Sequence, residues 1–109
     1  MLALVVVAAL LAVAPGVALA QPAVAAFPSP NTTSSLPQTQ ITFRGIPASQ
    51  IGHITVVGSS SGAHSGTIEA DSDGQGGSFI PSTPFTAGET VTVTTGLDVL
   101  GGTNGSFQF

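Results

Sequence analysis

Alternation of apolar and polar residues marks a strand in the last third of the chain. From Thr90 to Thr94, the valines at 91 and 93 fall on one face and the threonines on the other. A period of two is the pattern of a half-buried β-strand. The segment 81–89, with two prolines and Phe85, precedes it and predicts a corner. We therefore expect the other strands to pack around residues 81–95.

The same alternation predicts five further strands, each bounded by turn residues. They cover residues 40–44, 53–57, 64–72, 78–80 and 106–109. One helical turn is expected at 47–51 and a long glycine-rich connection at 97–105. Asp73-Gly74 predicts a hairpin turn, because glycine adopts positive φ without strain.

Short strands at regular spacing, with turn residues between them, are typical of an all-β sandwich. We predict one such domain over residues 39–109. Its core is expected to contain the inward residues of the strands together with Phe85. These residues are Ile41, Phe43, Ile54, Val56, Ile68, Phe79, Phe85, Val91, Val93, Phe107 and Phe109.

Residues 1–20 predict a secretory signal peptide. Leu2 to Ala14 is an unbroken apolar run that Pro15-Gly16 ends, and Ala18 and Ala20 supply the small residues of a cleavage site. The run is too short for a membrane span, which needs roughly 20 apolar residues. A buried core helix is the alternative, but nothing amphipathic or capped surrounds the run. We expect cleavage after Ala20 and a product that is secreted, extracellular or held at the cell surface.

Residues 21–38 contain four prolines among serine, threonine and asparagine. Proline removes backbone donors, and the stretch has little apolar content with which to order itself. The composition predicts a semi-extended linker between the signal peptide and the domain.

Charge and cysteine content narrow the classes of function. The sequence has one basic and five acidic residues, a net charge of −4, and no cysteine. A single arginine cannot neutralise many phosphates, so nucleic acid is not an expected partner. Without cysteine, disulfides, thiolate metal sites and thiol catalysis are excluded.

Gly58 to Gly62 matches G-x-S-x-G after a predicted strand, with His64 close by. A nucleophile elbow needs a helix directly behind the serine and a large α/β sheet beneath it. Gly62 and Gly66 interrupt any such helix, and the chain is short. The pattern therefore favours a flexible Ser/Gly loop over a hydrolase site.

Asp71, Asp73 and Gln75 place oxygen atoms at positions one, three and five of a calcium-binding loop, with Gly76 at position six. Position twelve is Ser82, where such a loop needs a bidentate Glu, and no helices are expected on either side. The favoured interpretation is a hairpin turn with acidic side chains in solvent, and calcium is the alternative.

Two further combinations of polar residues bear on chemistry. His53 and His64 with Glu69 could hold zinc, but their spacing matches no local ligand motif, so surface imidazoles are favoured. Arg44 is the only cation of the sequence. An ion pair of Arg44 with Glu69 or Glu89 is expected to contribute little if it is exposed.

Four segments, taken in order, carry a resemblance to a known domain. They are PSP at 28–30 followed by QITFR at 40–44; Asp73-Gly74 followed by SFIP at 78–81; PFTAGE at 84–89 before TVTV at 90–93; and GLD at 96–98 with Gly101, Gly102 and Asn104 before SFQF at 106–109. In that order they resemble the bacterial Ig-like domain of the S-layer-protein type. The resemblance implies a small Ig-like antiparallel β-sandwich over residues 39–109.

A second resemblance involves GSSSGAHSG at 58–66 and SFIPSTPF at 78–85. These stretches are similar to the N-terminal β-domain of secreted arylsulfotransferase-like proteins. In that family the chemistry belongs to a β-propeller with a catalytic histidine. No propeller is present in this sequence, so none of the family's catalytic residues is carried over.

The sequence favours a non-catalytic secreted Ig-like module with a structural, spacer or adhesion role, as a fragment of a longer exported protein. Its expected partners are downstream domains of the same polypeptide or cell-surface components. The alternative is the N-terminal accessory domain of a secreted arylsulfotransferase-like enzyme. No catalytic residue or cofactor site is predicted, because the sequence pairs no nucleophile with an oriented base and has no phosphate loop.

Overall fold

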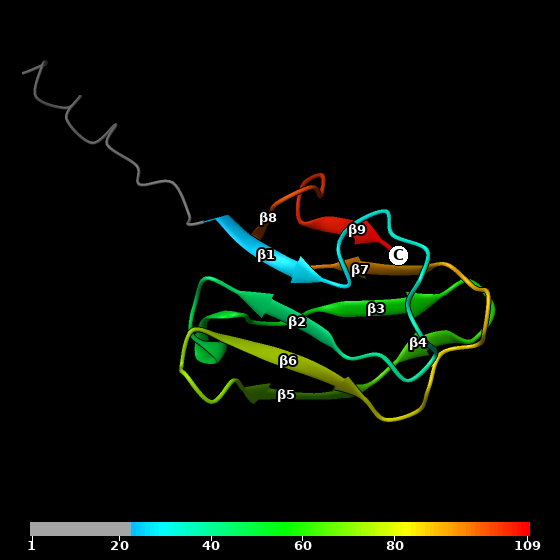
Figure 1. Cartoon of the computed structure of the whole chain (residues 1–109), viewed down its shortest axis with the longest axis horizontal. Coiled ribbons are helices and arrows are strands. Elements are labelled where there is room, and N and C mark those ends of the chain that lie inside the picture. The colour runs from blue at the N-terminus through cyan, green and yellow to red at the C-terminus, as the bar shows by residue number, and fades with distance from the viewer. Residues whose placement is uncertain (1–22) are drawn as a thin grey trace, which may run out of the picture.

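A computed structural model describes residues 23–109, which form two β-sheets packed face to face as a sandwich (Figure 1). The five-stranded sheet contains, in spatial order, β5 (Gly66–Ala70), β6 (Gly76–Pro81), β2 (Ile41–Arg44), β1 (Ala23–Phe27) and β8 (Asp98–Val99). The four-stranded sheet contains β4 (Gly62–His64), β3 (Thr55–Gly58), β7 (Val91–Thr94) and β9 (Ser106–Gln108). The expected all-β class is confirmed.

The strand registers explain how the alternating pattern builds the core. Residues directly opposite each other in antiparallel strands share a face. Ile41 lies opposite Phe79 in one sheet, and Val93 lies between Val56 and Phe107 in the other. All five of these side chains are buried, so the inward residues of the two sheets meet in one apolar layer.

Most of the predicted core is buried, and three predicted members lie at its margin. Ile54, Ile68 and Phe109 are only partly buried, although they pack against the cluster. The pattern also missed several buried residues. These are Val24, Ala26, Ile46, Ile51 and Val99.

The predicted linker is wrong for Ala23–Phe27, which forms β1 inside the five-stranded sheet. Val24 and Ala26 are 0% and 3% exposed, and β1 pairs with β2 on one side and β8 on the other. The domain therefore does not begin at residue 39. The predicted signal peptide, residues 1–20, lies outside the described residues.

The β1–β8 pair is parallel, so the sheet is not antiparallel throughout as predicted. Between β1 and β2 the chain has turns at residues 30–31 and 37–38 and no strand. The Asn31 amide donates to the Gln108 carbonyl (2.7 Å), and the Phe85 amide donates to the Pro37 carbonyl (2.9 Å). Residues 28–38 are thus held against the domain at two points, because neither hydrogen bond is local in sequence.

Two turns arise from local sequence chemistry. Gly74 adopts φ +73°, and its amide donates to the Asp71 carbonyl, which confirms the predicted hairpin between β5 and β6. Asn104 and Gly105 both have positive φ, and Thr103 and Ser106 exchange two backbone hydrogen bonds across them. Asn-Gly with positive φ at both positions is the signature of a type I′ hairpin turn, which the predicted open connection over 97–105 overlooked.

A short 3-10 helix, η2 (Ala48–Gln50), confirms the predicted helical turn. Ile51, which comes directly after it, is 2% exposed and covers Gly77, where any side chain would overlap Ala48 and Ile51. Among the helices of residues 23–109, none is long and apolar enough to cross a membrane.

Candidate functional site

Polar chemistry gathers at two places in the described structure, and each joins segments that are distant in sequence. We name the first the Arg44 clasp, made of Arg44, Asp71 and Asp73. Arg44 Nη1 donates to Asp71 Oδ2 and Asp73 Oδ1, both at 2.9 Å, and Nη2 donates to Asp73 Oδ2 at 2.6 Å. The ion pair with Asp73 is bidentate, which is the strongest arrangement for a guanidinium and a carboxylate. The clasp ties β2 to the β5–β6 hairpin.

The Arg44 clasp perturbs the pKa of Arg44 and the pKa of Asp73. Hydrogen bonds from Arg44, with a further bond from the Gln75 amide, hold the pKa of Asp73 well below its usual range. The hydrogen bonds that Arg44 donates, to Asp73 first and to Asp71 second, raise the pKa of Arg44 itself. Asp71 also accepts a hydrogen bond from the Ser78 hydroxyl at 3.1 Å.

This arrangement bears on the calcium alternative. The carboxylates of Asp71 and Asp73 already face a guanidinium, so a cation between them would have to displace Arg44. The ion pair of Arg44 with Glu69 or Glu89, which the sequence allowed, does not form among the described residues. Arg44 pairs with Asp71 and Asp73 instead, because the turn at Gly74 brings both aspartates to it.

The second polar cluster, the Glu89 clamp, consists of Glu89 and the donors around its carboxylate. Oε1 accepts the amides of Ser60 (2.7 Å) and Ser61 (2.8 Å). Oε2 accepts the Thr86 amide and the Ser61 hydroxyl, both at 2.6 Å. Partial burial would raise the pKa of Glu89, but these four neutral donors outweigh it and lower the pKa to about 2.

The Ser/Gly stretch therefore differs from the predicted flexible loop. It is a hydrogen-bonded turn between β3 and β4, and Gly58 gives the carboxylate room to reach it. A Cβ atom at position 58 would overlap the Glu89 carboxylate and the Ser61 hydroxyl. The close approach requires glycine, although this Gly58 has no positive φ.

Ser61, His64 and Glu89 bring a hydroxyl, an imidazole and a carboxylate together in an order unlike that of a catalytic triad. Ser61 Oγ lies between His64 Nε2 (2.7 Å) and Glu89 Oε2 (2.6 Å). The single hydroxyl proton of Ser61 points to the ionised carboxylate, which can only accept. His64 Nε2 must then donate to Ser61, so His64 cannot take the proton of Ser61 as a general base.

The two histidines do not form a zinc site with Glu69. His64 packs against Phe85 with the ring planes tilted by 54° and the ring centroids 4.5 Å apart, and its Nδ1 lies 3.4 Å from the Thr83 hydroxyl. No group of three or more His, Asp or Glu side chains within residues 23–109 is arranged to hold a metal ion.

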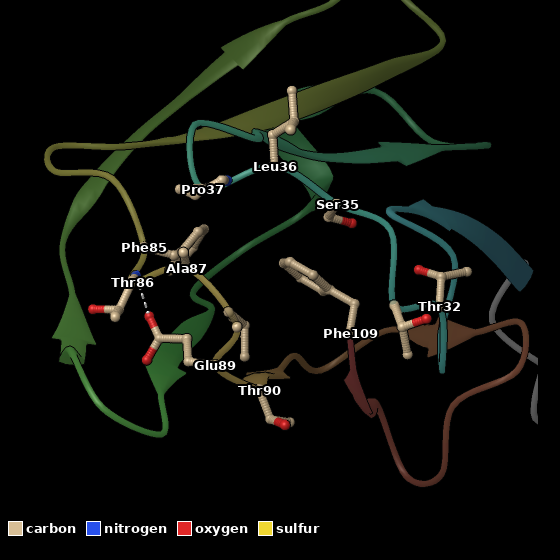
Figure 2. Close-up of a pocket in the computed structure, with 13 residues that line it drawn as sticks. Thr32, Ser35, Leu36, Pro37, Phe85, Thr86, Ala87, Glu89, Thr90 and Phe109 are labelled. Atoms are coloured by element: carbon tan, nitrogen blue, oxygen red, sulfur yellow. Dashed lines mark hydrogen bonds between the residues drawn. The ribbon is translucent and has the colours of Figure 1, made fainter.

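Beside the Glu89 clamp lies a groove, here called the end groove, with a volume of about 200 Å³ (Figure 2). Figure 2 shows the Phe109 ring directed into it and Leu36 standing at its rim. Its lining combines apolar and hydroxyl side chains from residues 32–37, the turn before β7 and the last residue of the chain. The residues are Thr32, Thr33, Ser35, Leu36, Pro37, Phe85, Thr86, Ala87, Gly88, Glu89, Thr90, Val91 and Phe109.

The end groove offers shape and weak hydrogen bonds but little reactive chemistry. Its one ionised side chain, Glu89, already accepts four hydrogen bonds, and Phe85 packs edge-on against Phe109 with ring centroids 6.1 Å apart. Sequence reasoning missed the groove because residues 32–37 were assigned to a linker. The Glu89 clamp was missed because it joins a Ser/Gly turn to a glutamate far away in the sequence. No fixed spacing between the two marks such a contact in the sequence.

Comparison of the chain with protein-family models, with curated proteins and with solved structures found no match. The fold and the two polar clusters are therefore the basis for assigning a function.

Proposed function

We propose that this chain carries an Ig-like domain of a secreted protein and acts as a non-catalytic module with a structural, spacer or adhesion role. The strand order supports the Ig-like assignment. An Ig sandwich places strands A, B, E and D in one sheet and G, F and C in the other, with C′ added in some members. β1, β2, β6 and β5 match the first order, and β9, β7, β3 and β4 match the second.

The observation that carries the spacer role is the position of the two ends of the described chain. β1 begins beside Asp98 and runs toward Asn31, whose amide bonds to Gln108. β1 therefore begins at one end of the sandwich, and β9 ends toward the other (Figure 1). After cleavage at Ala20 only Gln21 and Pro22 would precede β1, so a spacer of this shape would hold a segment attached after β9 away from the N-terminus of the mature chain.

The polar clusters also support a module without catalysis. Within the Arg44 clasp, and separately within the Glu89 clamp, the polar side chains bond to groups of their own cluster. These bonds join segments that are distant in sequence. In the Glu89 clamp the Ser61 hydroxyl faces a carboxylate whose lowered pKa makes it a weak base, and His64 donates to Ser61 instead of accepting its proton. The expected partners are downstream domains of the same polypeptide or cell-surface components.

The alternative role, an accessory domain of an arylsulfotransferase-like enzyme, rests on the sequence similarity of residues 58–66 and 78–85. In this role, as in the first, the chain itself catalyses no reaction. Sulfotransfer from a phenolic sulfate donor, catalysed by the purified secreted protein, would contradict both roles.

A distance measurement between engineered cysteines tests the spacer role, because the natural chain has none. Spin labels on the exposed positions of Ala23→Cys and Gln108→Cys should give one long, narrow distance distribution. The matched control pairs Ser29→Cys with Gln108→Cys and should give a short distance, since Asn31 contacts Gln108. A broad distribution for the first pair, or one as short as the control, would refute a rigid spacer.

Binding to the surface of the producing cells separates adhesion from spacing. A spacer should show no saturable binding of the purified protein to whole cells or envelope fragments. Saturable binding that survives washing would favour adhesion.

A further inference from the structure

The four edge strands of the sandwich are unequal. β4 and β9 have three residues each and β8 has two, whereas β5 has five. β9 is also partly covered, because the Asn31 amide bonds to the Gln108 carbonyl. β5 lies at the rim of the five-stranded sheet, and its second edge faces no other strand of the described chain (Figure 1). An open edge of this length is a template for pairing with another strand.

The hydrogen bonds at both ends of the β5–β6 ladder show which backbone groups are already used. The Asp71 amide donates to the Gly76 carbonyl (2.9 Å), and the Ser82 amide donates to the Ser65 carbonyl (2.8 Å). In an antiparallel ladder, every second residue turns its amide and carbonyl toward the partner. The backbone amides and carbonyls of the odd-numbered residues of β5 therefore point toward β6. Those of the even-numbered residues point away from the sheet, at its free edge.

The outward set is Gly66, Ile68 and Ala70. Pro81 lies opposite Gly66. Because proline has no amide hydrogen, it fits a pair that makes no β5–β6 hydrogen bond. Three amides and three carbonyls therefore line the free edge. They can pair with a further strand without disturbing any existing hydrogen bond of the sheet.

An apolar groove, here called the side groove, opens directly beside this edge and has a volume of about 380 Å³. Ile54, Ile68 and Phe79 contribute its apolar surface, and Ile54 and Ile68 are only partly buried. A strand added to β5 would extend the sheet over this opening and bury the exposed part of Ile68.

The sequence of β5 complements itself in one antiparallel register. Pairing Ile68 with Ile68 of a second copy brings all three outward residues into hydrogen bonding and sets Thr67 opposite the second copy's Glu69. If the pairing were centred on Glu69 instead of Ile68, Glu69 would lie directly opposite Glu69 of the second copy. Like charges directly opposite each other destabilise paired strands. If it were centred on Thr67, Ala70 would have no partner within β5 of the second copy.

We propose that β5 is a self-association site, at which two copies of this chain pair their β5 strands antiparallel about Ile68 and join two five-stranded sheets into one. The second copy is favoured over an unrelated peptide because the register that pairs most backbone groups is also the one that keeps the glutamates apart. The inference goes beyond the proposed module function and does not depend on it.

Charge changes at Thr67 test both the partner and the register. The natural chain, secreted by an expression host, is compared with Thr67→Lys, Thr67→Glu and the neutral control Thr67→Gln by sedimentation equilibrium. In Thr67→Lys the introduced ammonium would face Glu69 of the second copy twice in the dimer, so the dimer dissociation constant should fall by about two- to thirtyfold. Thr67→Glu should raise it by a similar factor, and Thr67→Gln should leave it nearly unchanged.

A backbone change tests the hydrogen bonding independently. Ala70→Pro removes an outward amide that takes no part in the β5–β6 ladder, and should weaken the dimer by about five- to a hundredfold. Ala70→Ser keeps the amide and serves as the matched control. Far-UV circular dichroism and thermal melts show whether the proline variant still folds, and the Thr67 series stands alone if it does not.

Two results would overturn the proposal. One is a monomer at every concentration up to millimolar, whether or not its edge accepts an unrelated extended peptide. The other is a dimer whose dissociation constant responds to neither the Thr67 nor the Ala70 variants, because that dimer would use a different surface.

Discussion

Glu89 and Asp73 are both carboxylates with a lowered pKa, yet their surroundings are opposite in kind. Asp73 faces the sole cation of the sequence, and its hydrogen bonds come mainly from Arg44. Glu89 has no cationic neighbour and is held by three backbone amides and one hydroxyl. The single arginine is already engaged by Asp71 and Asp73, so Glu89 is stabilised by neutral dipoles instead.

The difference affects how each cluster responds to change. A pair of opposite charges at the surface is screened by salt and tolerates small movements. A carboxylate held by four directed donors depends on the geometry of two turns and much less on ionic strength. The Glu89 clamp should therefore be sensitive to shape and the Arg44 clasp to salt.

The largest effect is expected from Glu89→Ala. The substitution leaves the amides of Ser60, Ser61 and Thr86 without their acceptor and frees the β3–β4 turn from the turn before β7. We expect the Tm to fall by several degrees, measured by thermal unfolding of the secreted protein. A Tm equal to that of the natural chain would show that solvent replaces the carboxylate without loss.

Gly58→Ala should have a similar effect by a different route. Its Cβ overlaps the Glu89 carboxylate, so the side chain must leave its donors. Since both substitutions remove the same interaction, Gly58→Ala combined with Glu89→Ala should destabilise by less than the sum of the single changes. Additive losses would mean that Gly58 acts independently of Glu89.

The next largest effect is expected from acid, which should weaken the Glu89 clamp. The folded-state pKa of about 2 lies below the ordinary value of 4.5, so ionised Glu89 stabilises the fold above about pH 4.5. That contribution is lost as pH falls from 4.5 toward 2. Glu89→Gln should flatten the fall of Tm with acid in this window. An unchanged slope would assign the acid sensitivity to other carboxylates.

The smallest effect is expected from Asp73→Asn. Arg44 and Asp73 are 36% and 53% exposed at their side chains, and Arg44 keeps its bond to Asp71. Tm should fall slightly at low salt, and the difference should vanish in concentrated sodium chloride. Glu89→Ala is the control, since its loss should persist in salt. A salt-independent loss for Asp73→Asn would contradict a mainly Coulombic role of the pair, since Asn can still accept the Gln75 amide.

Local pattern was sufficient for the strands that carry strong β-formers. The valines of β7, the pair Ile41 and Phe43, and the glycine of the β5–β6 turn all act through near neighbours, so they could be predicted without the rest of the fold. The same reasoning failed for β1. Ala-Val-Ala-Ala-Phe has little β-propensity, and it forms a strand because β2 and β8 offer backbone partners on both sides.

The sequence by itself determined the all-β class, most of the core and the scarcity of reactive chemistry, because period two, turn residues and composition are properties of short segments. Only the tertiary structure decided which carboxylates meet Arg44, what holds Glu89 and which edge of the sheet stays open. Each of these depends on contacts between residues some 30 positions apart, such as Ser60 and Glu89 or Arg44 and Asp73. Several acidic residues were equivalent candidates until the turns oriented them, and that orientation is a property of the folded backbone.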